Sequence, residues 1–257
     1  MRTGDKERGG WIFVSHSTKD IDAVYRVRDV LETRGHHPLL FFLRCLTEED
    51  EIDNLITREI EARNFFLYCD SPNARGSAWV QRELEFIRSL PDRVVHEVDL
   101  EEDPVTQVAS IRELSRAQTL FLSYANTDHE VVEAIAARLI EAEYRIWEPQ
   151  GSFSAGGVAS ELVRGGVAEA LDDGFVLVFL SPHSVQSEWV RHETEYALSL
   201  ARHHPRGGTA LRPIVLSHPA QMRGEFADAL RGLEWLDVSD LGATDAARRI
   251  VVSLRRR

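Results

Sequence analysis

Short apolar runs alternate along the chain with longer amphipathic segments. The runs at residues 11–14, 65–70 and 175–180 are continuous, and a polar turn follows each of them. A continuous run of this length predicts a strand that is buried on both faces, as in a parallel sheet. We predict strands at residues 11–14, 37–42, 65–70, 93–98, 119–122, 144–147, 175–180, 211–216 and 235–238. Pro213 predicts that the 211–216 strand lies at an edge, because proline lacks a backbone N–H.

The segments between these runs carry apolar residues at helical spacing. The first such segment has four of them on one face, Ile21, Val24, Val27 and Leu31. Asp20 precedes this segment and is placed to cap the helix. We predict further helices at residues 52–60, 79–90, 105–116, 132–139, 162–171 and 246–254, and one that begins at Trp189. Strands that alternate with such helices indicate an α/β fold, with parallel sheets and helices on both faces.

The whole pattern occurs twice. Residues 13–20 match residues 121–128, because in each stretch an apolar run ends at a serine and an aspartate follows five residues later. Residues 71–83 match residues 181–193, and each stretch contains Ser-Pro, then Ser-x-Trp-Val, then a glutamate four residues after the tryptophan. The offset is 108 residues for the first pair and 110 for the second, which indicates a duplicated domain. We therefore predict a tail at residues 1–10, a first domain at 11–117 and a second domain at 118–257.

Composition narrows the classes of function. The 257 residues are 43% hydrophobic and carry a net charge of −12, which disfavours a nucleic-acid surface. Two cysteines without a paired framework indicate a reducing compartment. The sequence shows neither an apolar run of membrane-spanning length nor a signal-peptide core, and its Cys/His spacing does not fit zinc. We expect a cytoplasmic protein with no nucleic-acid partner, no membrane partner and no metal.

The repeated motifs resemble those of the Toll/interleukin-1 receptor (TIR) domain. The resemblance is carried by Phe-Val-Ser-His-Ser-x-x-Asp and Phe-Leu-Ser-Tyr-Ala-x-x-Asp, each followed by Ser-Pro and Trp-Val-x-x-Glu, and it covers residues 11–90 and 119–240. It implies two flavodoxin-like domains, each a parallel five-stranded sheet with helices on both faces. Residues 148–159 look like the BB loop of the family, whereas residues 43–50 of the first copy lack its glycine-rich character.

Many TIR domains cleave nicotinamide from NAD+. The resemblance implies that Glu83 and Glu193 are the catalytic carboxylates and that NAD+ is a substrate, with no cofactor needed. The product would be ADP-ribose or a cyclic ADP-ribose-type signal in antiviral or stress defence, and the partners would be other TIR domains by self-assembly or a downstream effector. Ligands of such sheets bind beyond the carboxyl ends of the strands. The candidate substrate-binding residues there are Ser15, His16, Trp79, Ser123, Tyr124, Trp147 and Trp189.

These residues also have purely structural interpretations. A glutamate at a helix start is often solvated and favoured by the helix dipole. Trp79 and Trp189 equally suit core anchors, and Ser15 and Ser123 equally suit turns that cap the next helix. For the whole protein, the alternative is a non-enzymatic scaffold that acts through TIR–TIR assembly. A receiver domain is set aside, because it needs an acidic pair after the first strand, where both copies have a serine.

Overall fold

The protein is represented by a computed structural model, which describes residues 10–41, 49–91, 93–147, 167–168, 171, 174–202, 210–217, 228–230 and 232–255. Its contacts divide the chain into two compact units, one that ends at Gln118 and one that begins at Thr119. The expected loop at 148–159 lies outside the described residues, as does nearly all of the loop at 43–50. Of the expected tail, only Gly10 is described, and its carbonyl oxygen accepts a hydrogen bond from His37 N at 2.8 Å.

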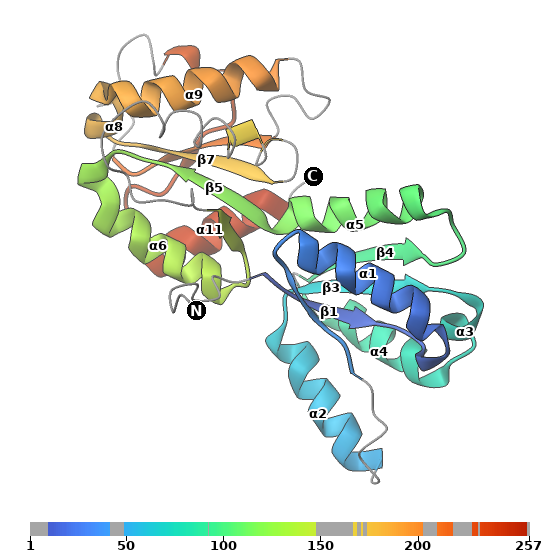
Figure 1. The fold of residues 1–257 in the computed structure, drawn as a ribbon. Coiled ribbons are helices and arrows are strands. Elements are labelled where there is room, and N and C mark those ends of the chain that lie inside the picture. Colours follow the sequence, from blue (N-terminus) through green and yellow to red (C-terminus); the bar gives the residue numbers. More distant parts are fainter. Residues whose placement is uncertain are drawn as a thin grey trace, which may run out of the picture. The chain divides into compact units, whose positions relative to one another are not determined.

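The first unit contains a parallel sheet with the strand order β2-β1-β3-β4 over its described residues. The strands are β1 (Trp11–Ser15), β2 (His37–Leu39), β3 (Phe65–Asp70) and β4 (Val94–Asp99). The helices are η1 (Thr18–Asp20), α1 (Ile21–Thr33), α2 (Glu49–Ala62), α3 (Pro72–Arg75), α4 (Ala78–Ser89) and α5 (Pro104–Gln118). In Figure 1, α1 and α5 cover one face of this sheet and α4 covers the other.

This first sheet has four strands within the described ranges, rather than the five predicted. After β4 the chain enters α5, which continues to Gln118, and Thr119 already begins a strand of the second unit. The continuously described stretch 93–147 therefore leaves no residues between α5 and the second unit for a fifth strand.

The second unit has the strand order β6-β5-β7-β8-β9, and the prediction of five parallel strands is confirmed there. This is the flavodoxin-like order, in which the first strand lies between the second and the third. The strands are β5 (Thr119–Ser123), β6 (Arg145–Trp147), β7 (Phe175–Leu180), β8 (Leu211–Val215) and β9 (Leu236–Asp237). The helical segments that cover or flank them are η2 (Asn126–Asp128), α6 (His129–Glu141), α8 (Pro182–Gln186), α9 (Glu188–Ala201) and α11 (Ala243–Arg255).

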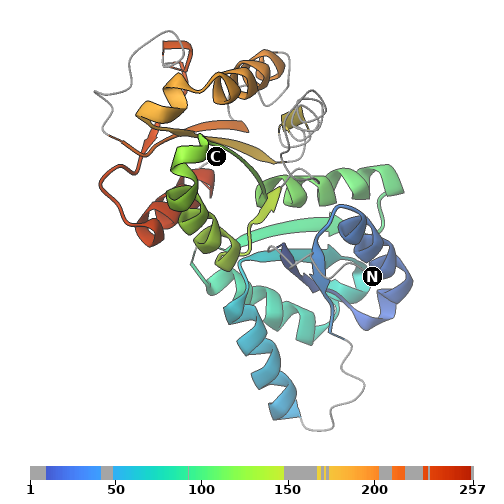
Figure 2. The same cartoon turned by 60° about the vertical axis from the view of Figure 1, so that its left-hand side comes forward.

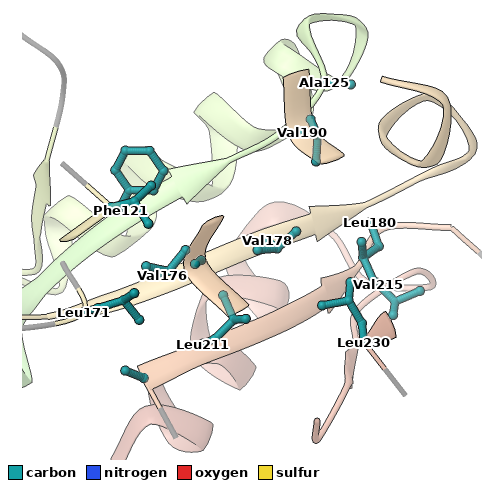
Figure 3. Close-up of a cluster of buried hydrophobic side chains, with 13 residues drawn as sticks. Phe121, Ala125, Leu171, Val176, Val178, Leu180, Val190, Leu211, Val215 and Leu230 are labelled. Atoms are coloured by element: carbon teal, nitrogen blue, oxygen red, sulfur yellow. The ribbon is translucent and has the colours of Figure 1, made fainter. Parts of the chain in front are cut away.

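Helices cover both faces of the second sheet. The helix α9 lies on one face, and α6 and α11 lie side by side on the other in both views (Figures 1 and 2). The core under α9 is drawn in Figure 3, where Phe121, Val176 and Val178 from the strands are drawn in one buried cluster with Val190 of α9. All six residues of β7 are buried, which explains why its sequence is a continuous apolar run.

The predicted edge position of the strand that contains Pro213 is wrong. Strand β8 lies between β7 and β9. It pairs with β9 only at Ile214 and Val215, so Pro213 precedes the start of that ladder. A proline is tolerated in an interior strand here because the neighbouring strand is short and begins one residue later.

Candidate active site

Glu83 lies one helical turn after Trp79 on α4, close to the carboxyl end of β1. The helix begins beside Ser77, whose Oγ accepts a hydrogen bond from Val80 N at 3.4 Å. Two donors reach the Glu83 carboxylate: Ser15 Oγ donates to Oε2 at 2.7 Å, and Trp79 Nε1 donates to Oε1 at 2.7 Å. One residue from the end of a strand and one from the helix therefore fix both carboxylate oxygens.

A cavity of about 290 Å³ opens beside this carboxylate. One wall is the loop that follows β1, the other is the segment from α3 to the start of α4, and Glu83 is half-buried between them. The lining residues are Phe13, Val14, His16, Ser17, Thr18, Lys19, Phe41, Asn73, Gly76, Ser77, Trp79, Val80 and Glu83. The position agrees with the general rule that parallel sheets bind ligands beyond the carboxyl ends of their strands.

A second hollow of about 210 Å³ lies between α2 and α4, and Trp79 and Glu83 line it as well. Ile56, Ile60 and Phe86 supply its apolar walls. The Arg82 guanidinium carbon lies 5.2 Å from the centre of the Trp79 ring, in the range of a cation–π contact. Trp79 therefore lines both hollows while it also packs on the core cluster of Phe13 and Ile60, as a core anchor does; its role in substrate binding stays a prediction.

Burial is the largest cause of the pKa shifts of Glu83 and His16, which both line the cavity. Burial raises the pKa of Glu83, and the hydrogen bonds from Ser15 and Trp79 oppose that rise without cancelling it. Burial lowers the pKa of His16, which is 8% exposed. Its Nδ1 donates to Val14 O at 3.0 Å, so the ring is held against the strand from which the loop leaves.

The second unit repeats the bond between serine and glutamate. Ser123 Oγ donates to Glu193 Oε2 at 2.5 Å, and Glu193 on α9 is 9% exposed. The hydroxyl oxygen of Tyr124 lies 3.1 Å from His129 Nδ1, and the two rings stack with centres 6.0 Å apart. Tyr124 is thus engaged with the start of α6. The side chains of Trp147 and Trp189 lie outside the described residues, so their predicted roles stay predictions.

In each unit a second hydrogen bond, between an aspartate and a serine, also joins the segment after the first strand to the segment that leads to the glutamate. The sequence analysis did not predict it. Asp20 was predicted to cap α1, but its side chain makes no capping bond there. It accepts a hydrogen bond from Ser71 Oγ at 2.6 Å instead, and Asp128 accepts one from Ser181 Oγ in the second unit. The signal was present in the sequence, because the aspartate and the Ser-Pro pair both recur in the duplication.

The described residues hold no group of three or more His, Cys, Asp or Glu side chains suited to a metal ion. Within the same ranges, the helices all fall short of the length and apolar character that a bilayer crossing requires.

Two comparisons with known proteins bear on this site. The family model described as TIR domain matches residues 12–115 and again residues 120–251. A protein of Staphylococcus aureus (strain MSSA476) named NAD(+) hydrolase TirS is 36% identical to the chain over 75 residues. That match covers 29% of this chain and 26% of the relative, so the chain spans about a quarter of the protein it matches.

Proposed function

Because this chain belongs to the TIR domain family, we propose that it is an NAD+ nucleosidase that breaks the bond between nicotinamide and ribose. The observation that carries the proposal is the Glu83 carboxylate, which two donors orient at the edge of a cavity of about 290 Å³. The partial match to a protein named NAD(+) hydrolase supports the same reaction.

The chemistry suits a single well-placed carboxylate. When the bond between ribose C1′ and the nicotinamide nitrogen breaks, its electron pair leaves with the nicotinamide. The pyridinium becomes neutral nicotinamide, so the leaving group needs no proton, and positive charge develops on the ribose. An ionised Glu83 would stabilise that charge. Ser15 and Trp79 each donate one hydrogen bond to the carboxylate, which has further lone pairs to accept bonds from the ribose hydroxyls.

Other residues of the lining suit the rest of the substrate. Trp79 offers an aromatic surface beside Glu83, on which a nicotinamide or adenine ring can stack. Lys19 contributes an exposed positive charge at the opposite wall, of opposite sign to the diphosphate of NAD+. Attack by water on C1′ gives ADP-ribose, and attack by a ring nitrogen of the adenine gives cyclic ADP-ribose, which lacks the elements of that water. Each route releases one proton. Glu193 and Ser123 form the corresponding candidate site of the second unit.

The proposal is tested by incubating the purified chain with NAD+ and separating the products by chromatography with mass detection. We expect free nicotinamide in equal amount to the NAD+ consumed, together with ADP-ribose or a cyclic ADP-ribose that is one water lighter. The measurement is repeated over a range of protein concentrations, because TIR domains that assemble would act only when concentrated. Self-association without any release of nicotinamide would contradict the enzyme and favour the scaffold.

In the pH profile of kcat/KM, the fall on the acid side should lie at a higher pH than the pKa of an ordinary glutamate. Catalysis needs ionised Glu83, and burial raises its pKa above the usual 4.5, so kcat/KM should begin to fall at a higher pH than 4.5 as the solution is acidified. Ser15→Ala removes a hydrogen bond that lowers the pKa of Glu83 and should move the limb further upward. A midpoint at or below pH 4.5 would contradict the assignment of this limb to Glu83.

A further inference from the structure

We propose that Asp20 is a positioning residue of the Glu83 site. Its side chain holds the two walls of the cavity together. The Asp20 carboxylate accepts two hydrogen bonds from residues more than 50 positions away in the sequence. Ser71 Oγ donates to Oδ2 at 2.6 Å, and Asn73 Nδ2 donates to Oδ1 at 2.6 Å. Both carboxylate oxygens are therefore engaged by the segment that opens α3.

The two sides of this link carry the two walls. Asp20 is the last residue of η1 and directly follows residues 16–19, which form one wall of the cavity. Ser71 begins α3, and its Oγ also accepts a hydrogen bond from Ala74 N at 2.9 Å. From there the chain runs through Gly76 and Ser77, which line the other wall, into α4 and on to Glu83.

The loop of residues 16–19 is thus fixed at both of its ends. At one end Ser15 is hydrogen-bonded to Glu83, and at the other end Asp20 is hydrogen-bonded to Ser71 and Asn73. Loss of the Asp20 link would remove one of these two ties and leave the segment joined at its other end to the Glu83 carboxylate. A shift of the loop would then move the Glu83 carboxylate, whose placement sets the rate of the reaction.

Helix capping does not account for this aspartate. Asp20 stands at the N-cap position of α1, and Asp128 stands at that of α6, yet neither side chain makes a capping hydrogen bond. Each instead accepts from the serine of a Ser-Pro pair, Ser71 or Ser181. The second unit therefore repeats both links, serine to glutamate and aspartate to serine.

The test is a double-mutant cycle of Asp20→Asn and Asn73→Asp in the full chain. Asn73→Asp places a second carboxylate against that of Asp20, and the repulsion should lower kcat/KM for NAD+ about tenfold, mainly through kcat. Asp20→Asn alone can keep both hydrogen bonds, because its amide oxygen accepts from Asn73 Nδ2 while its NH2 donates to Ser71 Oγ, so kcat/KM should stay within about threefold of wild type. In the double variant the new amide donates to the new carboxylate and the repulsion is gone, so kcat/KM should return to within about threefold of wild type. Asp22→Asn, at an exposed acid two residues further along α1, serves as the matched control.

The activity readout rests on the proposed function, so a second readout is independent of it. Hydrogen exchange of the backbone amides at residues 16–19 should be faster in Asn73→Asp than in wild type, and slow again when Asp20→Asn is added to it. If wild type releases no nicotinamide, the proposed function fails and the exchange result alone decides this inference. Wild-type exchange in Asn73→Asp would overturn it, as would unchanged kcat/KM in an active Asn73→Asp variant or a double variant no better than Asn73→Asp alone.

Discussion

Glu83→Gln should lower the rate of nicotinamide release from NAD+ on the order of 10³-fold. The amide has the shape of the carboxylate but lacks the charge that stabilises the developing positive ribose. Its hydrogen bonds can all be kept. The amide oxygen accepts from Trp79 Nε1, and the amide NH2 donates to Ser15 Oγ, which changes from donor to acceptor.

The same change should leave the protein folded and no less stable at pH 7. Because the pKa of Glu83 is raised in the folded state, the stabilisation from its protonated form is complete below pH 4.5 and is lost as the pH rises through the raised pKa. A neutral amide does not undergo this loss. The melting temperature of Glu83→Gln at pH 7 should therefore equal or exceed that of wild type.

Two further variants make the result specific. Glu85→Gln removes an exposed glutamate from the same helix and should leave turnover unchanged. Glu193→Gln measures how much of the nicotinamide release comes from the second unit. We expect the larger loss from Glu83→Gln, because Glu83 borders a cavity whereas Glu193 is only 9% exposed. Turnover by Glu83→Gln equal to that of wild type would contradict the site assignment.

Gly174→Ala should destabilise the second unit by about 1–3 kcal/mol, the usual cost of forcing extra atoms into a packed site. Gly174 immediately precedes β7, and a Cβ atom built there would lie 2.5 Å from the carbonyl oxygen of Thr119, the first residue of β5. The clash is with backbone, so a rotamer change of a side chain cannot relieve it. Strands β5 and β7 would have to move apart where their pairing begins.

Urea unfolding measures this loss as a lower midpoint with an unchanged slope. Gly232→Ala is the matched control, because a Cβ there meets nothing within 4 Å. It should stay within about 0.5 kcal/mol of wild type, as surface changes usually do. Equal midpoints for the two variants would show that the close approach of β5 and β7 at Gly174 does not limit stability.

The strands were predictable because burial on both faces requires apolar residues, and these form continuous runs in the sequence. Strands β3 and β7 are buried along their whole length, so their residues are apolar without alternation. The prediction at residues 235–238 also corresponds to a strand, β9 (Leu236–Asp237). The Ser-Pro stretches were expected to be turns, but each opens a short helix, α3 or α8, because serine is a strong N-cap and proline fits the first helical position.

The site was predictable in part. The pairing of Ser15 with Glu83 joins two residues that the repeated motifs had singled out, although which atoms meet required the fold. Asp20 was misjudged, because local sequence offers it a helix to cap while its partner Ser71 lies 51 residues away. The fifth strand of the first sheet was inferred from family resemblance, and the direct passage from α5 into β5 is where this chain departs from it.

The most direct test of the central claim is nicotinamide release from NAD+ by the purified wild-type chain and by the double variant Glu83→Gln/Glu193→Gln. The double variant removes both candidate carboxylates while the hydrogen-bonding geometry at Glu83 can be kept. We predict release by wild type and none above background by the double variant at equal folded concentration. Absence of release by wild type, or equal release by both proteins, would contradict the claim.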